Sequence, residues 1–129
     1  GSAKISPIVL KFMKQCFSHC HIYEAYGITE CGGVAYNNSI QNMVAYRLES
    51  VPEMGYTVDD KPFPRGEILT KTTQMFSGYV NNVEETLAAL TDDGFFRTGD
   101  IVELRTDSCG QIDIHVIDRK KNFFKLIFE

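Results

Sequence analysis

A β-hairpin pattern near the end of the chain constrains the fold most strongly. Isoleucine or valine occupies every second position from 112 to 116, within a strand-like segment over residues 111–117. A second such segment covers residues 101–105, and the loop of residues 106–110 between the two segments is short and contains glycine. A two-residue period is typical of a strand with one buried face. We therefore predict two antiparallel strands, with His115 on the solvated face and not acting as a ligand.

Three more segments have strand patterns. Residues 44–48 alternate between apolar and polar side chains, and residues 67–72 are rich in β-forming types. Prolines and glycines between residues 52 and 66 predict a loop that separates these two strands. An earlier short strand is predicted at residues 21–26, with Gly27 ending it.

Two helices are predicted from their start signals. Ser6 is a favourable N-cap and Pro7 suits the first helical position. The apolar residues that follow recur near a period of 3.6, namely Ile8, Val9, Phe12, Met13 and Phe17. Asn82, followed three residues later by Glu85, has the pattern of a capping box. We expect Leu87 and Leu90 to form the buried face of this second helix.

Composition indicates a globular protein and disfavours two classes of partner. The 129 residues are 43% hydrophobic and 23% charged, with a formal net charge of −4. Without a basic run, nucleic acid and anionic membrane surfaces are poor partners, and no apolar stretch is long enough to span a bilayer. Four irregularly spaced cysteines are predicted to be reduced thiols of a cytoplasmic protein. The cluster of Cys16, His19, Cys20 and His21 lacks the paired loops of structural zinc sites, so a helix end is expected there instead.

The first of three polar motifs is Tyr-Gly-Ile-Thr-Glu at residues 26–30. Gly27 lets the backbone approach a ligand closely. The ring of Tyr26 is suited to stacking on a purine, and the hydroxyl of Thr29 to bonding a phosphate oxygen. The Glu30 carboxylate suits Mg²⁺, which prefers oxygen ligands. The alternative is an ordinary strand and turn with this sequence by chance.

Two further polar motifs lie at residues 97–100 and 118–121, Arg-Thr-Gly-Asp and Asp-Arg-Lys-Lys. A tight turn at the glycine would present the Asp100 carboxylate, whose two oxygens suit the two hydroxyls of a ribose through charge-assisted hydrogen bonds. An ion pair between Arg97 and Asp100 at a strand end is the alternative. The second motif, taken alone, is also typical of a solvated basic surface.

Together, in this order and at these distances, the three motifs resemble the nucleotide-binding half of adenylate-forming enzymes. This superfamily includes acyl-CoA synthetases, luciferases and peptide-synthetase adenylation domains. The resemblance covers about residues 20–125, and residues 51–56 and 64–67 are most similar to the adenylation domains of carboxylic acid reductases, followed by long-chain acyl-CoA synthetases. Residues 66–68 resemble a further family motif that is mostly structural, and we assign no chemistry to it.

The resemblance implies a mixed α/β fold and a division of the chain. Residues 3–41 are expected to end a larger α/β subdomain that carries the first motif, and residues 42–117 to form a small distorted β-barrel subdomain. Residues 118–129 would be a truncated hinge segment. The family's phosphate loop would lie upstream and its C-terminal domain with a catalytic lysine downstream, so we expect an internal fragment that is inactive by itself.

The resemblance also implies residue roles and cofactors. It implies that Thr29 and Glu30 are catalytic and that Glu30 also binds the metal. The implied nucleotide-binding residues are Tyr26, Gly27, Asp100 and Arg119. Lys121 would be the hinge. The parent enzyme would use ATP and Mg²⁺ to activate a carboxylic acid, by family likeness a fatty acid, as an acyl-adenylate. The acyl group would then pass to CoA or to the phosphopantetheine of a carrier-protein domain. Lys125 matches a frequent family lysine whose role stays open, and after Leu126 the chain departs from the usual glycine-containing loop.

Two other interpretations stay open from sequence. In the first, the chain is a non-catalytic β-barrel interaction module derived from this family. In the second, it is an unrelated small barrel with chance motifs. Loss of both catalytic segments from the native gene would favour the first. The second is disfavoured, because independent motif matches at family-like spacing multiply.

Overall fold

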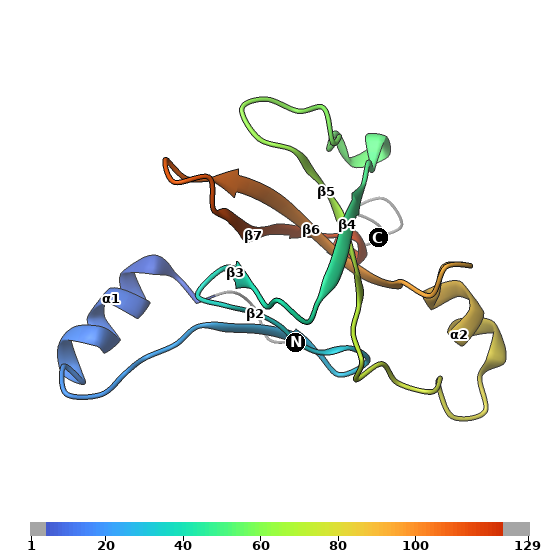
Figure 1. Ribbon diagram of the computed structural model, residues 1–129, viewed down its shortest axis with the longest axis horizontal. Helices are drawn as coiled ribbons and strands as arrows, with labels where there is room; N and C mark the ends of the chain where they lie inside the picture. Colours follow the sequence, from blue (N-terminus) through green and yellow to red (C-terminus); the bar gives the residue numbers. More distant parts are fainter. Residues whose placement is uncertain (1–4, 123–129) are drawn as a thin grey trace.

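A computed structural model of the chain describes residues 5–122. Its elements in chain order are α1 (Pro7–Cys16), β1 (Ala25–Ile28), β2 (Gly32–Tyr36), β3 (Ser39–Ile40), β4 (Ala45–Glu49), η1 (Pro52–Met54), β5 (Arg65–Lys71), α2 (Val83–Ala89), β6 (Phe96–Thr106) and β7 (Ile112–Arg119). The strands form one antiparallel sheet in the order β1-β2-β3-β7-β6-β5-β4 (Figure 1). The predicted mixed α/β fold is confirmed, with the barrel present as a sheet that does not close.

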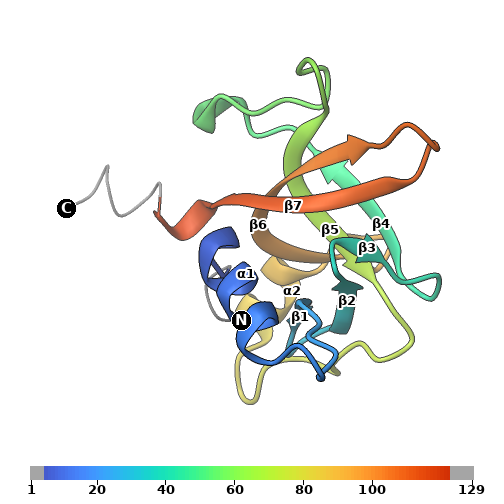
Figure 2. The same cartoon turned by 90° about the vertical axis from the view of Figure 1, so that its left-hand side faces the viewer.

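Strand β7 connects the two halves of this sheet. It pairs on one side with the long strand β6 and on the other with β3, through Ser39 and Asp113. Figure 2 shows β7 crossing the molecule between β6 and β3, while α1 and α2 stand at opposite ends in Figure 1. The β1–β3 segment and the β4–β6 segment therefore belong to the same sheet.

The hydrophobic core is formed mainly by side chains of the sheet strands. Its buried members are Val34, Ala35, Val44, Ile68, Val102 and Ile114. Most of β5 is buried on both faces, since residues 66–70 are all buried. The predicted hairpin is confirmed, with Glu103 opposite His115 in the β6–β7 ladder. The strands predicted at residues 44–48 and 67–72 are present as β4 and β5.

The predicted end of the first strand at Gly27 is wrong. Strand β1 runs through Gly27, which lies opposite Gly33 of β2, and a register shift separates it from Tyr26. A Cβ atom at Gly27 would lie 2.9 Å from the Gly32 carbonyl oxygen and 3.2 Å from Gly33 Cα. The two strands approach so closely that only glycine fits, and the glycine signals close strand pairing here.

Both predicted helices are present, but the buried face predicted for the second helix is not. The Asn82 side chain accepts a 3.0 Å hydrogen bond from the Glu85 N–H, as the capping pattern predicts. Ser6 precedes α1, yet its side chain makes no capping hydrogen bond. Leu87 is 71% exposed, Phe12 of α1 is 63% exposed, and neither helix contains a buried residue. Periodicity identified an apolar face correctly, whereas burial depends on what covers that face.

Within residues 5–122, no helix combines the length and apolar content needed to cross a membrane. In the same part of the chain, no three potential metal-ligating side chains gather as a site. Helix α1 ends at Cys16, as expected for the cysteine–histidine cluster, and residues 16–21 are all exposed. All four cysteines are free thiols, of which Cys31 alone is buried.

The Ile68 side chain is fully buried in the core, so its truncation tests the fold directly. We expect Ile68→Ala to lower the free energy of unfolding by about 2–5 kcal/mol, because apolar contacts are lost and a cavity remains. The matched control Leu87→Ala removes an exposed side chain and should change it by less than about 0.5 kcal/mol. Chemical denaturation of the chain measures both, and equal losses would contradict this core.

Candidate functional site

A cavity of about 550 Å³ brings the three polar motifs together. Its lining includes Tyr26 and Gly27 from β1, Asp100 from β6, and Asp118 and Arg119 from β7. Apolar side chains of β2 and β7 line it as well, among them Ala35, Ile114 and Val116. Four of the residues predicted to bind a nucleotide therefore share one cavity, although they lie far apart in sequence.

Asp100 is the buried centre of this cavity wall. It is 3% exposed, and each carboxylate oxygen accepts one hydrogen bond. The Tyr26 hydroxyl donates to Oδ2 at 2.7 Å, and Arg119 Nε donates to Oδ1 at 2.8 Å. Arg119 faces Asp100 directly in the β6–β7 ladder. One carboxylate thus joins all three motifs, and each oxygen keeps acceptor capacity for a further donor.

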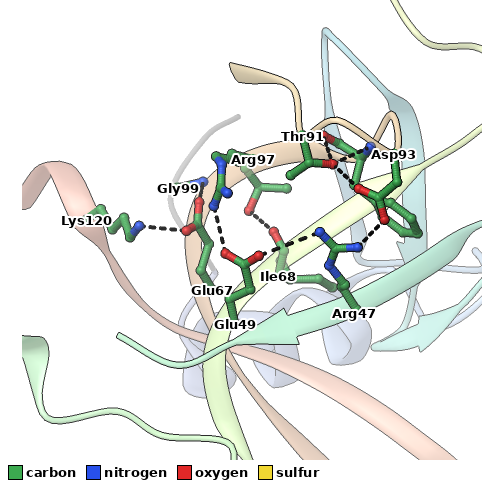
Figure 3. A network of polar contacts seen from close by, with 11 residues as sticks. Arg47, Glu49, Glu67, Ile68, Thr91, Asp93, Arg97, Gly99 and Lys120 are labelled. Carbon is green, nitrogen blue, oxygen red and sulfur yellow. Dashed lines mark hydrogen bonds and ion pairs between the residues drawn. The ribbon is translucent and has the colours of Figure 1, made fainter. Parts of the chain in front are cut away.

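The alternative ion pair between Arg97 and Asp100 is wrong. Arg97 Nη1 lies 2.7 Å from Glu49 Oε2 on β4, away from Asp100. Glu49 also pairs with Arg47 at 3.6 Å, and Arg47 in turn pairs with Asp93 (Figure 3). Arg97 therefore belongs to a separate polar network that connects β4 and β6.

A β-bulge aims Asp100 into the cavity, where a tight turn was expected. Residues 97–100 all lie inside β6, and the register against β5 shifts between Glu67 and Leu69. Gly99 has φ +71°, a left-handed conformation that glycine adopts without strain. Its N–H donates to Glu67 Oε1 at 3.0 Å. Bulges commonly re-aim a side chain beside a functional site, and this one does so for Asp100.

Electrostatics fix the protonation states of the groups around Asp100. Burial, reinforced by the neighbouring Asp100 carboxylate, raises the pKa of Tyr26 far above its usual range. The hydrogen bond to Asp100 raises the pKa of the Arg119 guanidinium. Tyr26 therefore stays a hydroxyl donor and Arg119 stays a cation, while 45% of the Arg119 side chain remains exposed.

Thr29 and Glu30 lie in the turn after β1 and outside the lining of this cavity. Glu30 Oε1 accepts a 3.0 Å hydrogen bond from the Tyr79 hydroxyl. Burial, followed by the hydrogen bond to Glu30, raises the pKa of Tyr79 to about 12, so Tyr79 donates. Glu30 Oε2 accepts no hydrogen bond from residues 5–122. Glu30 therefore keeps one oxygen for a cation, and Thr29 is exposed beside it.

The hinge motif begins at the end of β7. Asp118 Oδ2 accepts a 3.1 Å hydrogen bond from the Tyr56 hydroxyl, and Lys120 Nζ lies 2.6 Å from Glu67 Oε2. Lys121 is exposed and lies in helical backbone over residues 120–122. The predicted hinge segment continues beyond this point, so Lys125 and the altered tail lie outside the described residues.

Three polar residues of this region escaped functional prediction: Glu67, Tyr56 and Tyr79. Glu67 was noted only as part of a structural motif, although a carboxylate within the apolar run of β5 is a signal for a buried, paired charge. The two tyrosines each donate to a motif carboxylate from a loop. No local pattern identifies such long-range partners.

A comparison of the sequence with family models agrees with this geometry. Residues 1–80, more than half of the chain, match the model described as AMP-binding enzyme. The chain belongs to the AMP-binding enzyme family. The predicted resemblance is therefore confirmed, and the first motif, at residues 26–30, lies within the matched residues.

The similar relatives and solved structures include carboxylic acid reductases and an acyl-CoA ligase. The carboxylic acid reductase of Mycobacterium tuberculosis is 38% identical over 128 residues, covering 98% of this chain and 11% of that protein. The peroxisomal acyl-CoA ligase 891 of Penicillium roqueforti is 39% identical over 137 residues, which cover 98% of this chain and 19% of that protein. Among solved structures, the A-PCP didomain of the Segniliparus rugosus carboxylic acid reductase in complex with AMP has a TM-score of 0.83 and 34% sequence identity. The match covers 93% of this chain and 16% of that chain. The chain thus spans under a fifth of the length of each of these relatives.

The Tyr26–Asp100 hydrogen bond should contribute measurably to the stability of this chain. We expect Tyr26→Phe to lower the free energy of unfolding by about 1.5–3 kcal/mol, since a hydrogen bond to a charged group is lost. Tyr23→Phe is the control, because Tyr23 is 64% exposed. Denaturant unfolding of both variants measures the difference. A Tyr26→Phe effect no larger than the control would show that the bond is dispensable.

Proposed function

We propose that this chain forms one wall of the nucleotide site of an ATP-dependent adenylate-forming enzyme. The enzyme would convert a carboxylate and MgATP to an acyl-adenylate and pyrophosphate. The observation that carries the proposal is the buried Asp100 carboxylate, bonded to Tyr26 and Arg119 at the wall of the cavity. Residues from the three motifs converge there.

Each residue of the wall offers a separate contact. Asp100 keeps acceptor capacity on both oxygens for the two hydroxyls of a ribose. Arg119 gives only Nε to Asp100, which leaves its two Nη groups as donors toward ribose or phosphate oxygens. Tyr26 is held by its hydroxyl, so its ring is fixed for contact with a purine, and Gly27 adds backbone without a side chain.

The turn after β1 fits a magnesium–phosphate end of the same site. Mg²⁺ is commonly held by one or two carboxylates together with substrate phosphates. Glu30 supplies one such carboxylate, with Oε1 fixed by Tyr79 and Oε2 free of the described residues. We assign Thr29, exposed on the same turn, to hydrogen bonding with phosphate. The bound ion would supply charge neutralisation at the phosphates.

The acyl substrate and acceptor belong to this proposal too. The names of the relatives, carboxylic acid reductase and acyl-CoA ligase, support a carboxylic acid substrate, and we propose a fatty acid. The acceptor would be the thiol of CoA or of a phosphopantetheine carrier, and the A-PCP didomain supports a carrier-protein partner. We propose a cytoplasmic location from the free thiols, although four relatives are named as peroxisomal.

The proposed division of the chain assigns residues 3–41 to the larger α/β subdomain, 42–117 to the barrel-like subdomain and 118–129 to the hinge. The exposed apolar residues of α1 and α2 support contacts with other parts of a longer protein. Val83 and Leu87 are 72% and 71% exposed, and Ile8 is 81% exposed. Apolar side chains exposed on one helix face are typical of packing surfaces.

Asp100→Ala in the full-length protein tests the nucleotide assignment. Each lost charge-assisted hydrogen bond is worth about 1.5–3 kcal/mol, so the Michaelis constant for ATP should rise about tenfold or more. Carboxylate-dependent ATP–pyrophosphate exchange measures it. The control is Asp93→Ala, which removes an exposed carboxylate paired with Arg47. Unchanged ATP kinetics in Asp100→Ala would make the Asp100–Arg119 pair purely structural.

Lys121→Pro tests the hinge in the same protein. Proline fixes φ near −65°, so it should hamper a residue that must change its backbone angles between two half-reactions. We expect acyl-adenylate formation to continue and thioester formation to fall. Lys121→Ala is the control, because it removes the side chain and keeps the backbone freedom. Losses of both half-reactions together would point to misfolding, and loss of neither would place the hinge elsewhere.

A further inference from the structure

Glu67 is a buried carboxylate outside the proposed nucleotide cavity. It lies on β5 and is 2% exposed. Its Oε1 accepts the Gly99 N–H at 3.0 Å, and its Oε2 lies 2.6 Å from Lys120 Nζ (Figure 3). Apart from this ion pair, Oε2 has no hydrogen-bond partner among residues 5–122. A buried charge without a partner is strongly unfavourable, so Lys120 is held firmly at this position.

Lys120 is the last of three consecutive residues that different parts of the sheet hold in place. Asp118 accepts a hydrogen bond from Tyr56, and Arg119 donates one to the buried carboxylate of β6. The next side chain, Lys121, is exposed and makes no hydrogen bond or ion pair with residues 5–122. The side-chain restraints therefore stop between Lys120 and Lys121.

We propose that Glu67 is a positioning residue that fixes the end of β7, so that backbone rotation begins at Lys121 and no earlier. This inference rests on the hinge role proposed for Lys121. The same carboxylate holds the Gly99 bulge, which directly precedes Asp100. The Glu67 contact separates the moving part of the hinge from the nucleotide wall.

Four variants of the full-length protein test this role. Glu67→Gln keeps an acceptor for the Gly99 N–H and removes the attraction for Lys120. Lys120→Met removes the cation and leaves the buried carboxylate unpaired, and the double variant removes both charges. The matched control is Arg105→Met, because Arg105 forms an exposed 2.6 Å ion pair with Glu103 on the same hairpin.

The two half-reactions and the melting temperature separate positioning from structure. Lys120→Met should lower the melting temperature most, and the double variant should recover it, because no buried charge then lacks a partner. We expect thioester formation to fall at least about fivefold relative to acyl-adenylate formation in both single variants and in the double variant. Arg105→Met should match the wild type. Recovery of both half-reactions along with stability in the double variant would overturn the proposal, as would equal loss of the two half-reactions.

Hydrogen exchange tests the anchor separately from catalysis. Backbone amides of residues 118–122 should exchange faster in Glu67→Gln than in the wild type or in Arg105→Met, because the end of β7 is released. Unchanged exchange would overturn the anchoring role of Glu67. A wild-type protein that forms no acyl-adenylate would instead contradict the proposed function, and the exchange result would still decide whether Glu67 fixes Lys120.

Discussion

The hydrogen bond between Tyr26 and Asp100 is the contact on which the shape of this molecule depends. Strand β1 lies four positions from β6 in the sheet order, and neighbouring strands are about 4.8 Å apart. In a flat sheet the two strands would be separated by about 19 Å, further than a tyrosine side chain reaches. The observed 2.7 Å bond requires the sheet to curve back on itself. The cavity lies where the curved sheet brings the motifs together.

The two buried carboxylates of the region share one bulge and one basic segment. Glu67 holds Gly99 in place, and the next residue, Asp100, points into the cavity. Their cationic partners, Lys120 and Arg119, are also consecutive. Each carboxylate needs its own cation, because a single buried charge without a partner is costly. The Asp-Arg-Lys-Lys motif therefore serves the fold and the proposed site at the same time.

Local sequence patterns predicted elements well and their environments poorly. Alternation along residues 111–117 correctly predicted a strand, because a two-residue period follows from strand geometry itself. Gly27 was expected to end a strand and Gly99 to form a tight turn, whereas both lie inside strands, one at a close strand contact and one in a bulge. Leu87 was expected to be buried, but it lies on an apolar helix face that no described residue covers. A glycine indicates a position where the backbone needs space or an unusual conformation, and an apolar face indicates a surface to be covered. Only the tertiary contacts show which backbone feature or which covering residues are present.

The site itself depended on convergence, which sequence could only imply through family likeness. Nothing in the local sequence around Asp100 predicts that Arg119 binds it and that Arg97 does not. The strand register decides this, because Asp100 faces Arg119 across the β6–β7 ladder, while Arg97 faces Leu69. The bulge shifts residues 98–100 against β5, and Arg97 is then close to Glu49 of β4 instead. Arg97 and Asp100 lie only three positions apart in β6, yet they pair with residues of different strands, so the ion pairs of the site follow from backbone register more than from residue type.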